Sequence, residues 1–593
     1  MWSLATTTNI EAEGTNAVPK PSDYLFGSEK RPANIIPQGN FTDQGFCMSL
    51  PPATDTEAEK TNAVPKPRPI TSARIAALKV VIALPSIRQA GYDCPAILSI
   101  FMIRAACKTI AMTTVAMSTK LLNPSRSLVV AVGLTAYASV LARGGEVLID
   151  PDVYMHIVVG RWILDHGALP YADTFSHSMH GMPWVPHEWL AEVVFAWLYD
   201  HFGWTSQVVV TALAVGLAVA LLARALIYYL TPVYAVIGAM LAWGMCFPHL
   251  LARPHVFVYP LVVLWAAGLV AARQENRAPS PLLLIVLVLW ANVHGSFLFG
   301  IVLAALFAAE ALLEAADWPA ARRVVYGWGL FGLLSLVAAF ATPNGLAGFL
   351  LPIKTVRMSF AMSWISEWQS PNFQQFQPLE LWLMLVLVGA LLLGVRLPIT
   401  RIAIMLVLLH MTLQHLRHGE YLGFITPLLV APALALQLPR SLEDLGMPAL
   451  RVKLPSGATF ALGALALAMV ATGARMGMMR TIDRVTPSAA LAAAREHQVA
   501  GPVFNDFNFG GFLIFSGVPT MIDGRTDLYG DAFNRRYSRI EELPRLLGEY
   551  RIGWTLLRAG TPGAVLMDYL PGWQRLYADD IAVLHARKGA ADR

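Results

Sequence analysis

The chain has 593 residues, of which 56% are hydrophobic and only 14% are charged, whereas soluble domains carry about 25% charged residues. The net charge of +5 is small, which argues against a nucleic-acid-binding protein. The four cysteines have spacings that fit neither a zinc site nor a disulfide framework.

Residues 1–116 differ in composition from the rest of the chain. Residues 1–70 are polar and proline-rich, and they hold a near-perfect repeat at 11–21 and 57–67. Such a composition buries too little apolar surface to order itself. Two interpretations remain open. Residues 1–116 are either a disordered region of the protein or an upstream extension that does not belong to it; in the second case the native protein begins at Met117. The intact mass of the native protein distinguishes them.

Long apolar runs recur from residue 128 to 476 and predict a polytopic α-helical membrane protein. Runs of roughly 17–22 residues give about eleven spans, within a membrane domain that covers 117–476. The predicted spans are 128–148, 206–227, 232–248, 255–272, 280–296, 297–316, 325–342, 379–395, 400–416, 420–438 and 457–476.

Basic residues alternate between the predicted loops, which orients the chain. Because positive charge is enriched on the cytoplasmic side, the N-terminus is predicted inside and the tail, 477–593, outside the plasma (inner) membrane of a bacterium. The residues that set this orientation are Lys120, Arg126, Arg224, Arg273, Arg277, Arg322, Arg323, Arg396, Arg401, Arg440, Arg451 and Lys453.

The first outer loop, 149–205, opens with a predicted helix at 151–166. Asp150 precedes Pro151, as an N-cap precedes a first-turn proline, and Asp152 lies four residues before His156 on one helical face. Either aspartate is suited to act as a general base or metal ligand. The alternative is structural: Asp150 caps the helix and Asp152 complements its dipole. Asp152 is the better candidate because Asp150 has that competing task.

Four further residues in the outer connections are candidates for binding a substrate. His187 and Glu188 begin a second amphipathic helix, which is too short to span a membrane. They are suited to binding a ligand, or Glu188 only complements a helix dipole. Arg253 and His255 flank a proline at a span end. Arginine binds phosphate oxygens by paired hydrogen bonds, although an interfacial arginine also occurs without a ligand.

Two later connections bring polar residues to the same predicted membrane face. Asn292 and His294 lie at the end of a predicted span. They are expected either to bind a ligand or only to form hydrogen bonds with the exposed end of the helix. Arg417 and His418 lie at the end of a stripe of polar residues at helical spacing. The stripe either lines the site or forms hydrogen bonds within the protein. Structural polar residues are expected on both faces, so their gathering on one face indicates a shared extracytoplasmic site.

The tail, 477–593, is less hydrophobic and predicts a small soluble α/β domain. Short apolar runs bounded by turns predict strands at 501–504, 511–515, 519–522 and 554–557, and helices are expected at 487–497 and 538–549. Two polar segments, 505–511 and 523–527, have two possible roles. They either bind a carbohydrate or acceptor, or form turns and ion pairs within the domain.

Two strings of residues stand out: Asp150-Pro-Asp…His156…Gly160-Arg-Trp-Ile-Leu…Asp173-Thr-Phe-Ser176…His187-Glu-Trp-Leu190 and Phe504-Asn-Asp…Gly510-Gly…Ile522-Asp-Gly-Arg525…Tyr529-Gly530. They resemble the GT-C superfamily of integral-membrane glycosyltransferases, and a poorly characterised bacterial group within it. The resemblance covers roughly 128–593 and leaves 1–116 unexplained. In many relatives the two acidic residues are adjacent, whereas here Pro151 separates them.

The resemblance implies sugar transfer from a polyprenyl-phosphate donor to an extracytoplasmic glycan, lipid or protein. Asp152 or Asp150 is implied as base or metal ligand, so a divalent metal stays an open question, and Arg253 with His187 or His255 is implied to stabilise the leaving phosphate. A donor that arrives through the bilayer needs no nucleotide cofactor. The alternatives are a multi-pass transporter, which usually binds its substrate near the bilayer midplane, and a non-catalytic scaffold with a binding tail.

Overall fold

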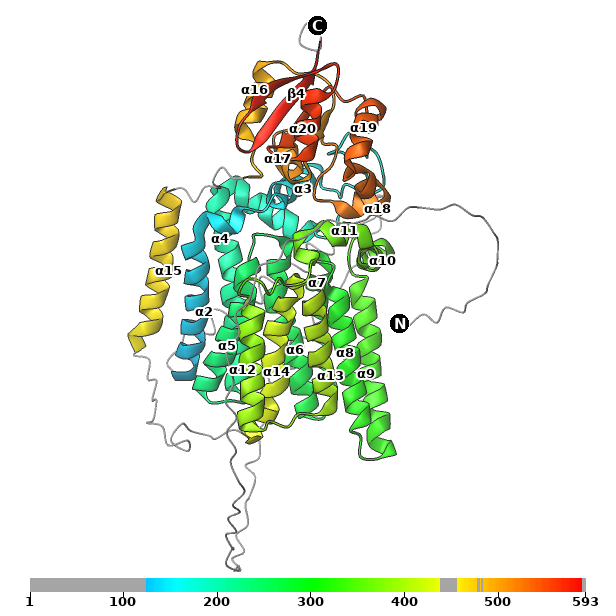
Figure 1. The fold of residues 1–593 in the computed structure, drawn as a ribbon. Coiled ribbons are helices and arrows are strands. Elements are labelled where there is room, and N and C mark those ends of the chain that lie inside the picture. The colour runs from blue at the N-terminus through cyan, green and yellow to red at the C-terminus, as the bar shows by residue number, and fades with distance from the viewer. Residues whose placement is uncertain (1–123, 438–455, 477–479, 481–483, 589–593) are drawn as a thin grey trace, which may run out of the picture. The chain divides into compact units, whose positions relative to one another are not determined.

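The computed structural model describes residues 124–437, 456–476, 480 and 484–588 (Figure 1). These residues all belong to one compact unit, Gly91–Arg593. The predictions for 1–116, and the basic residues predicted at 440–453, lie outside the described residues.

Apolar helices build the largest part of the described chain (Figure 1). Their buried aliphatic and aromatic side chains form one continuous core, and α2 packs against both α4 and α15. The helices are α2 (Pro124–Arg143), α4 (Trp189–Ile227), α5 (Pro232–Cys246), α6 (Val258–Gln274), α7 (Leu283–Val293), α8 (Phe297–Leu313), α9 (Trp318–Ala339), α12 (Pro378–Leu393), α13 (Ile399–Gln414), α14 (Gly419–Gln437) and α15 (Ser456–Met476).

Each predicted span overlaps one of these helices. By length and composition, four described stretches suffice to cross a membrane, as expected of a membrane protein, while the number of spans stays a prediction. The other apolar helices are shorter. The four stretches are Ser127–Leu148, Trp189–Ile227, Pro254–Gln274 and Leu416–Gln437.

Helix α3 (Asp152–His166) begins the segment between α2 and α4, in agreement with the predicted helix at 151–166. The predicted short helix after Glu188 and the following span form α4 together, with a kink at Gly203, whose φ is 63°. A positive φ of this kind is readily adopted only by glycine. Two short helices were not predicted, α10 (Gly345–Val356) and α11 (Ser359–Trp364).

The tail contains a four-stranded sheet in the order β1-β2-β4-β3. Strand β1 runs parallel to β2, and the two other pairings are antiparallel. The strands are β1 (Val503–Asn505), β2 (Trp554–Arg558), β3 (Trp573–Ala578) and β4 (Ala582–Arg587), and the helices are α16 (Ser488–Glu496), α17 (Gly510–Phe515), α18 (Thr526–Tyr537), α19 (Leu543–Glu549) and α20 (Pro562–Tyr569).

Two of the predicted tail strands are wrong. Residues 511–515 lie in helix α17, and 519–522 form only an isolated bridge, from Thr520 to Ser176. A short apolar run does not distinguish a strand from a buried helix. Helix α17 packs on α3, so the apolar surface of this run is buried by contact with the loop segment rather than by strand pairing.

A buried ion-pair cluster joins the tail to the segment between α2 and α4. Arg525 Nη1 lies 2.5 Å from Asp173 Oδ1, and its Nη2 lies 2.7 Å from Asp523 Oδ2. Tyr529 donates a 2.7 Å hydrogen bond to Asp523. The sequence allowed for ion pairs inside the tail, but Asp173 lies far outside it in the chain, so this cluster docks one part of the protein on another.

Candidate active site

Asp150 and Asp152 converge on one arginine, Arg253. Its Nη2 lies 2.5 Å from Asp150 Oδ2 and 3.1 Å from Asp152 Oδ2, and its Nη1 lies 2.5 Å from Glu367 Oε1. Arg253 precedes the short helix Pro254–Phe257 at the start of α6, and Glu367 lies in the connection after α11. The guanidinium thus faces two carboxylates from the segment between α2 and α4 and a third from the connection after α11, which holds both aspartates in fixed positions.

Asp150 is occupied by structural contacts. Its Oδ1 accepts a 2.7 Å hydrogen bond from the backbone N–H of Asp152, in the manner of a helix cap. The side chain of Arg480 donates to the backbone carbonyls of Leu148, Ile149 and Asp150. These contacts fix the start of α3 and leave Asp150 only 4% exposed.

Asp152 is the more available carboxylate of the pair. Burial raises its pKa to about 6, helped by the negative charges of Asp150 and Glu367 and opposed by Arg253 and His156. The neighbouring Glu367 behaves differently: burial raises its pKa, but Arg253 and Arg417 outweigh burial and hold the pKa below its ordinary value. A carboxylate with a pKa near neutrality is suited to general-base chemistry.

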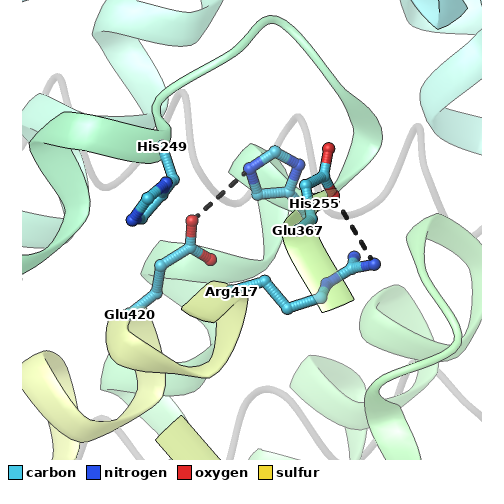
Figure 2. A pocket seen from close by; sticks show the side chains of 5 residues that line it. All are labelled: His249, His255, Glu367, Arg417 and Glu420. Atoms are coloured by element: carbon cyan, nitrogen blue, oxygen red, sulfur yellow. Dashed lines mark ion pairs between the residues drawn. The ribbon is translucent and has the colours of Figure 1, made fainter. Parts of the chain in front are cut away.

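A pocket lined in part by Glu367 brings one arginine and two histidines together (Figure 2). Arg417 Nη1 lies 3.7 Å from Glu367 Oε2, and its guanidinium stacks over Trp368 with 4.6 Å to the ring centroid. His255 Nε2 lies 3.6 Å from Glu420 Oε1. The lining residues are His249, His255, Glu367, Arg417 and Glu420.

Three imidazoles surround Glu188, and one of them, His156, interacts electrostatically with Asp152. The Nε2 atoms of His294, His187 and His156 lie 3.5, 3.8 and 4.0 Å from its carboxylate oxygens. His156 also contacts the buried Glu192, with 3.2 Å between His156 Nδ1 and Glu192 Oε1. This histidine and carboxylate cluster is the second group of titratable side chains around Asp152.

Two predicted site residues are held by bonds within the protein. Asn292 accepts from Trp189 Nε1 and donates to the carbonyls of Val288 and Ala341. His418 Nδ1 lies 3.1 Å from the carbonyl of Met411, and His418 does not line the pocket. The predicted polar stripe therefore brings only Arg417 to the pocket, because α13 ends at Gln414 and the chain turns there.

The carboxylate pair does not fit a metal site. Both carboxylates are paired with Arg253 at short distance, and a guanidinium in that position repels a cation. Within the described residues, no group of three histidine, cysteine or acidic side chains is arranged to hold a metal ion.

The tail reaches the site through the turn that precedes α18. A Cβ added to Gly524 would lie 2.6 Å from Cγ of Asp152 and 3.0 Å from its Oδ2, so the backbone of the tail packs directly on the candidate base. Burial raises the pKa of Asp527, three residues on, while the neighbouring His187 and Arg525 oppose the shift. Only glycine allows this approach to Asp152.

Gly524→Ala is expected to displace the Asp152 carboxylate and lower the activity of the site about 10- to 100-fold, since misplacing a reacting group by about 1 Å has effects of this size. Gly548→Ala is the matched control, because Gly548 lies in α19 with no heavy atom within 4 Å of an added Cβ. Both variants are compared by initial rate at equal protein concentration. Equal rates would contradict the direct packing of the tail on Asp152.

The chain is similar to ArnT and AglB. It is 16% identical to ArnT from Cupriavidus metallidurans bound to undecaprenyl phosphate, with a TM-score of 0.45 over 78% of this chain and 98% of that chain. The apo state of that ArnT gives 15% identity, a TM-score of 0.44 and the same coverage. AglB from Archaeoglobus fulgidus, in complex with an inhibitory peptide and a dolichol-phosphate, gives 10% identity and a TM-score of 0.47 over 76% of this chain and 74% of that chain.

No family model matches the chain, and no curated protein matches it. Identities this low do not transfer a substrate or a reaction between chains, so the function is argued from the residues of the site.

Several residues of the site carried no clear signal in the sequence. His249 and Glu192 lie in or beside apolar helices, where a single polar residue usually has a structural role. In the sequence, Gly524 stands out only as part of the polar segment 523–527. Its contact with Asp152 spans more than 370 positions in the chain, and a sequence pattern does not reveal contacts of that length.

Proposed function

We propose that this chain is a membrane glycosyltransferase that moves a sugar from a polyprenyl-phosphate donor to an acceptor hydroxyl outside the cytoplasm. The observation that carries the proposal is the arrangement of Asp152, a carboxylate with a pKa of about 6, next to a pocket lined by Arg417 and two histidines. One side is suited to accept a proton and the other to receive a phosphate, the two tasks of glycosyl transfer from a lipid phosphate.

Arg417 is the proposed phosphate-binding residue, with His255 beside it. The sequence suggested Arg253 for this task, but Arg253 already contacts three carboxylates. Among the described residues, Arg417 has one carboxylate within 4 Å, that of Glu367 at 3.7 Å, and its guanidinium borders the pocket. A guanidinium with a single distant counterion retains donors for phosphate oxygens.

In the proposed reaction, Asp152 removes the proton of the acceptor hydroxyl as the acceptor oxygen attacks the anomeric carbon. The bond from that carbon to the phosphate oxygen breaks, and its electron pair leaves with the polyprenyl phosphate. Arg417 stabilises the charge that develops on the phosphate. Arg253 keeps Asp152 oriented.

Arg417→Gln is expected to weaken binding of undecaprenyl phosphate about 10- to 100-fold, because a hydrogen bond to a charged group contributes about 1.5–3 kcal/mol. Binding is measured on the purified full chain by native mass spectrometry. Arg357→Gln is the control, since Arg357 is an exposed arginine at the end of α10. Unchanged binding in Arg417→Gln would refute the assignment of the phosphate site.

The reaction itself is tested with the full chain in proteoliposomes, radiolabelled undecaprenyl-phosphate hexoses and a cell-envelope extract as the source of acceptor. The expected result is transfer of label to an acceptor together with release of undecaprenyl phosphate. Movement of a solute across the vesicle membrane without transfer of label would instead support a transporter.

A further inference from the structure

Helix α11 packs on the tail, although it belongs to the connection that leads to Glu367. Its neighbours are α18 and the short helix Ser366–Trp368 (Figure 1). We propose that Asp531 of the tail is a positioning residue for the donor-phosphate site, because it holds α11 and, through α11, the segment that orients Arg417. This inference rests on the proposed function and extends its phosphate site to the tail.

The carboxylate of Asp531 binds the first turn of α11. Its Oδ2 accepts a 3.1 Å hydrogen bond from the backbone N–H of Phe360, and its Oδ1 accepts one of 3.1 Å from the N–H of Ala361. The first N–H groups of a helix lack a carbonyl partner within that helix, and a negative charge is favourable at this end. The residue before α11, Met358, makes no side-chain cap. Asp531 therefore supplies the cap from the tail.

A second side chain of α18 contacts the same turn of α11. The guanidinium of Arg535 lies 4.6 Å from the centroid of the Phe360 ring, within the range of a cation–π contact. The next residue, Ala361, is buried. The first turn of α11 is thus fixed to the tail by two hydrogen bonds to one carboxylate and by a ring contact beside them.

Asp531 is itself placed by the buried cluster that docks the tail. Gly530, just before it, has a φ of 70° and interrupts α18, a conformation that glycine adopts readily. Tyr529, one residue further back, donates its hydrogen bond to Asp523 of the buried cluster. The kink allows Tyr529 to stay in that cluster while Asp531, two residues on, contacts α11.

The other end of the segment contacts the loop that carries Arg417. Glu367 Oε2 lies 3.7 Å from Arg417 Nη1, and the Arg417 guanidinium stacks over the ring of Trp368. The two backbones are joined as well, because the N–H of Leu416 donates a 3.0 Å hydrogen bond to the carbonyl of Gln369. This segment therefore sets both the charge and the ring that Arg417 faces.

The two ends lie close together in the chain, so a shift at one end reaches the other. Glu367 follows Ala361 by six residues, and α11 fills most of that interval. Arg253 contacts Asp150 and Asp152 through Nη2 and Glu367 through Nη1, so the aspartates keep their own contact with it. The loss of Asp531 is therefore expected to raise the KM for the donor more than it changes kcat.

The first test measures binding of undecaprenyl phosphate to Asp531→Ala, in the full chain, by native mass spectrometry. Asp579→Ala is the matched control, since Asp579 also accepts two backbone N–H groups, those of Ile581 and Ala582, but within the tail. Asp531→Ala is expected to bind about fivefold or more weakly, the usual size of a coupling between sites. Asp531→Asn keeps one acceptor oxygen and is expected to have an intermediate affinity. Equal affinities of Asp531→Ala and Asp579→Ala would overturn the proposal.

A double variant shows whether Asp531 acts through Arg417. When Asp531→Ala is added to Arg417→Gln, little further loss of undecaprenyl phosphate binding is expected, because effects that share one group are not additive. A further loss as large as the one in the unmodified background would mean that Asp531 does not position Arg417, and it would overturn the proposal.

A last measurement needs no lipid. In Asp531→Ala, the amides of Phe360 and Ala361 are expected to exchange hydrogen roughly 2- to 30-fold faster, as after loss of a helix cap, and that of Leu416 is also expected to exchange faster. Unchanged exchange in β2 establishes that the tail is folded. Unchanged exchange at Leu416 would overturn the proposal. Faster exchange at Leu416, in a chain that binds no undecaprenyl phosphate even when unmodified, would refute the proposed function and leave the link from Asp531 to the Arg417 loop intact.

Discussion

Asp152→Asn is expected to lower sugar transfer about 100- to 10,000-fold, the range that a positioned general base contributes. An amide is nearly the same size as a carboxylate and keeps an oxygen for Arg253, so the surroundings of α3 are conserved while the base is lost. The rate is measured in proteoliposomes with labelled donor. Retained binding of undecaprenyl phosphate establishes that the variant is folded, and a rate within tenfold of the unmodified chain would contradict the role of Asp152.

The same carboxylate fixes the expected pH dependence. Its pKa is raised from the ordinary value to about 6, and only the ionised form accepts a proton. Transfer is therefore expected to be low below pH 6, to rise through a midpoint near 6 and to level off above it. A rate that falls over this range would mean that the group must be protonated, as a general acid is.

Arg525→Ala is expected to weaken the junction between the tail and the loop segment by about 3–5 kcal/mol, the usual effect of removing one partner from a buried ion pair. The side chains of Arg525, Asp173 and Asp523 are at most 1% exposed, so the variant leaves two carboxylates buried without their cation. The reporter is amide hydrogen exchange at His177, whose N–H donates to the carbonyl of Thr520 across the junction.

Arg575→Ala is the control for that experiment. Arg575 pairs with Asp568 on the surface of the tail, where an ion pair contributes little to stability, so exchange at His177 is expected to stay unchanged. Because Gly524 packs on Asp152 next to Arg525, the Arg525 variant is also expected to lose activity. Unchanged exchange at His177 would show that the buried cluster does not hold the junction.

Local regularities in the sequence predicted the elements of the membrane part. The length of an apolar run reflects the thickness of the membrane that a helix has to cross. The spans could therefore be predicted without knowing any tertiary contact, and each overlaps a helix. The start of α3 was predicted for a similar reason, since capping depends on neighbours within about four residues. Asp152 was preferred over Asp150 on this basis, and Asp150 does accept the backbone N–H bond expected of a cap.

Contacts between distant parts of the chain were decided only by the tertiary structure. Arg253 could be recognised as a cation for phosphate, but its three carboxylate partners come from connections that a linear pattern does not bring together. Residues 511–515 were predicted as a strand because a short apolar run fits either structure, and packing against α3 selects the helix. The sequence by itself thus determined the membrane helices and the acidic start of α3, because both depend on short-range physics. The tertiary structure decided which charged side chains come into contact. It therefore decided that Arg417 keeps donors for a phosphate and that Gly524 packs on Asp152.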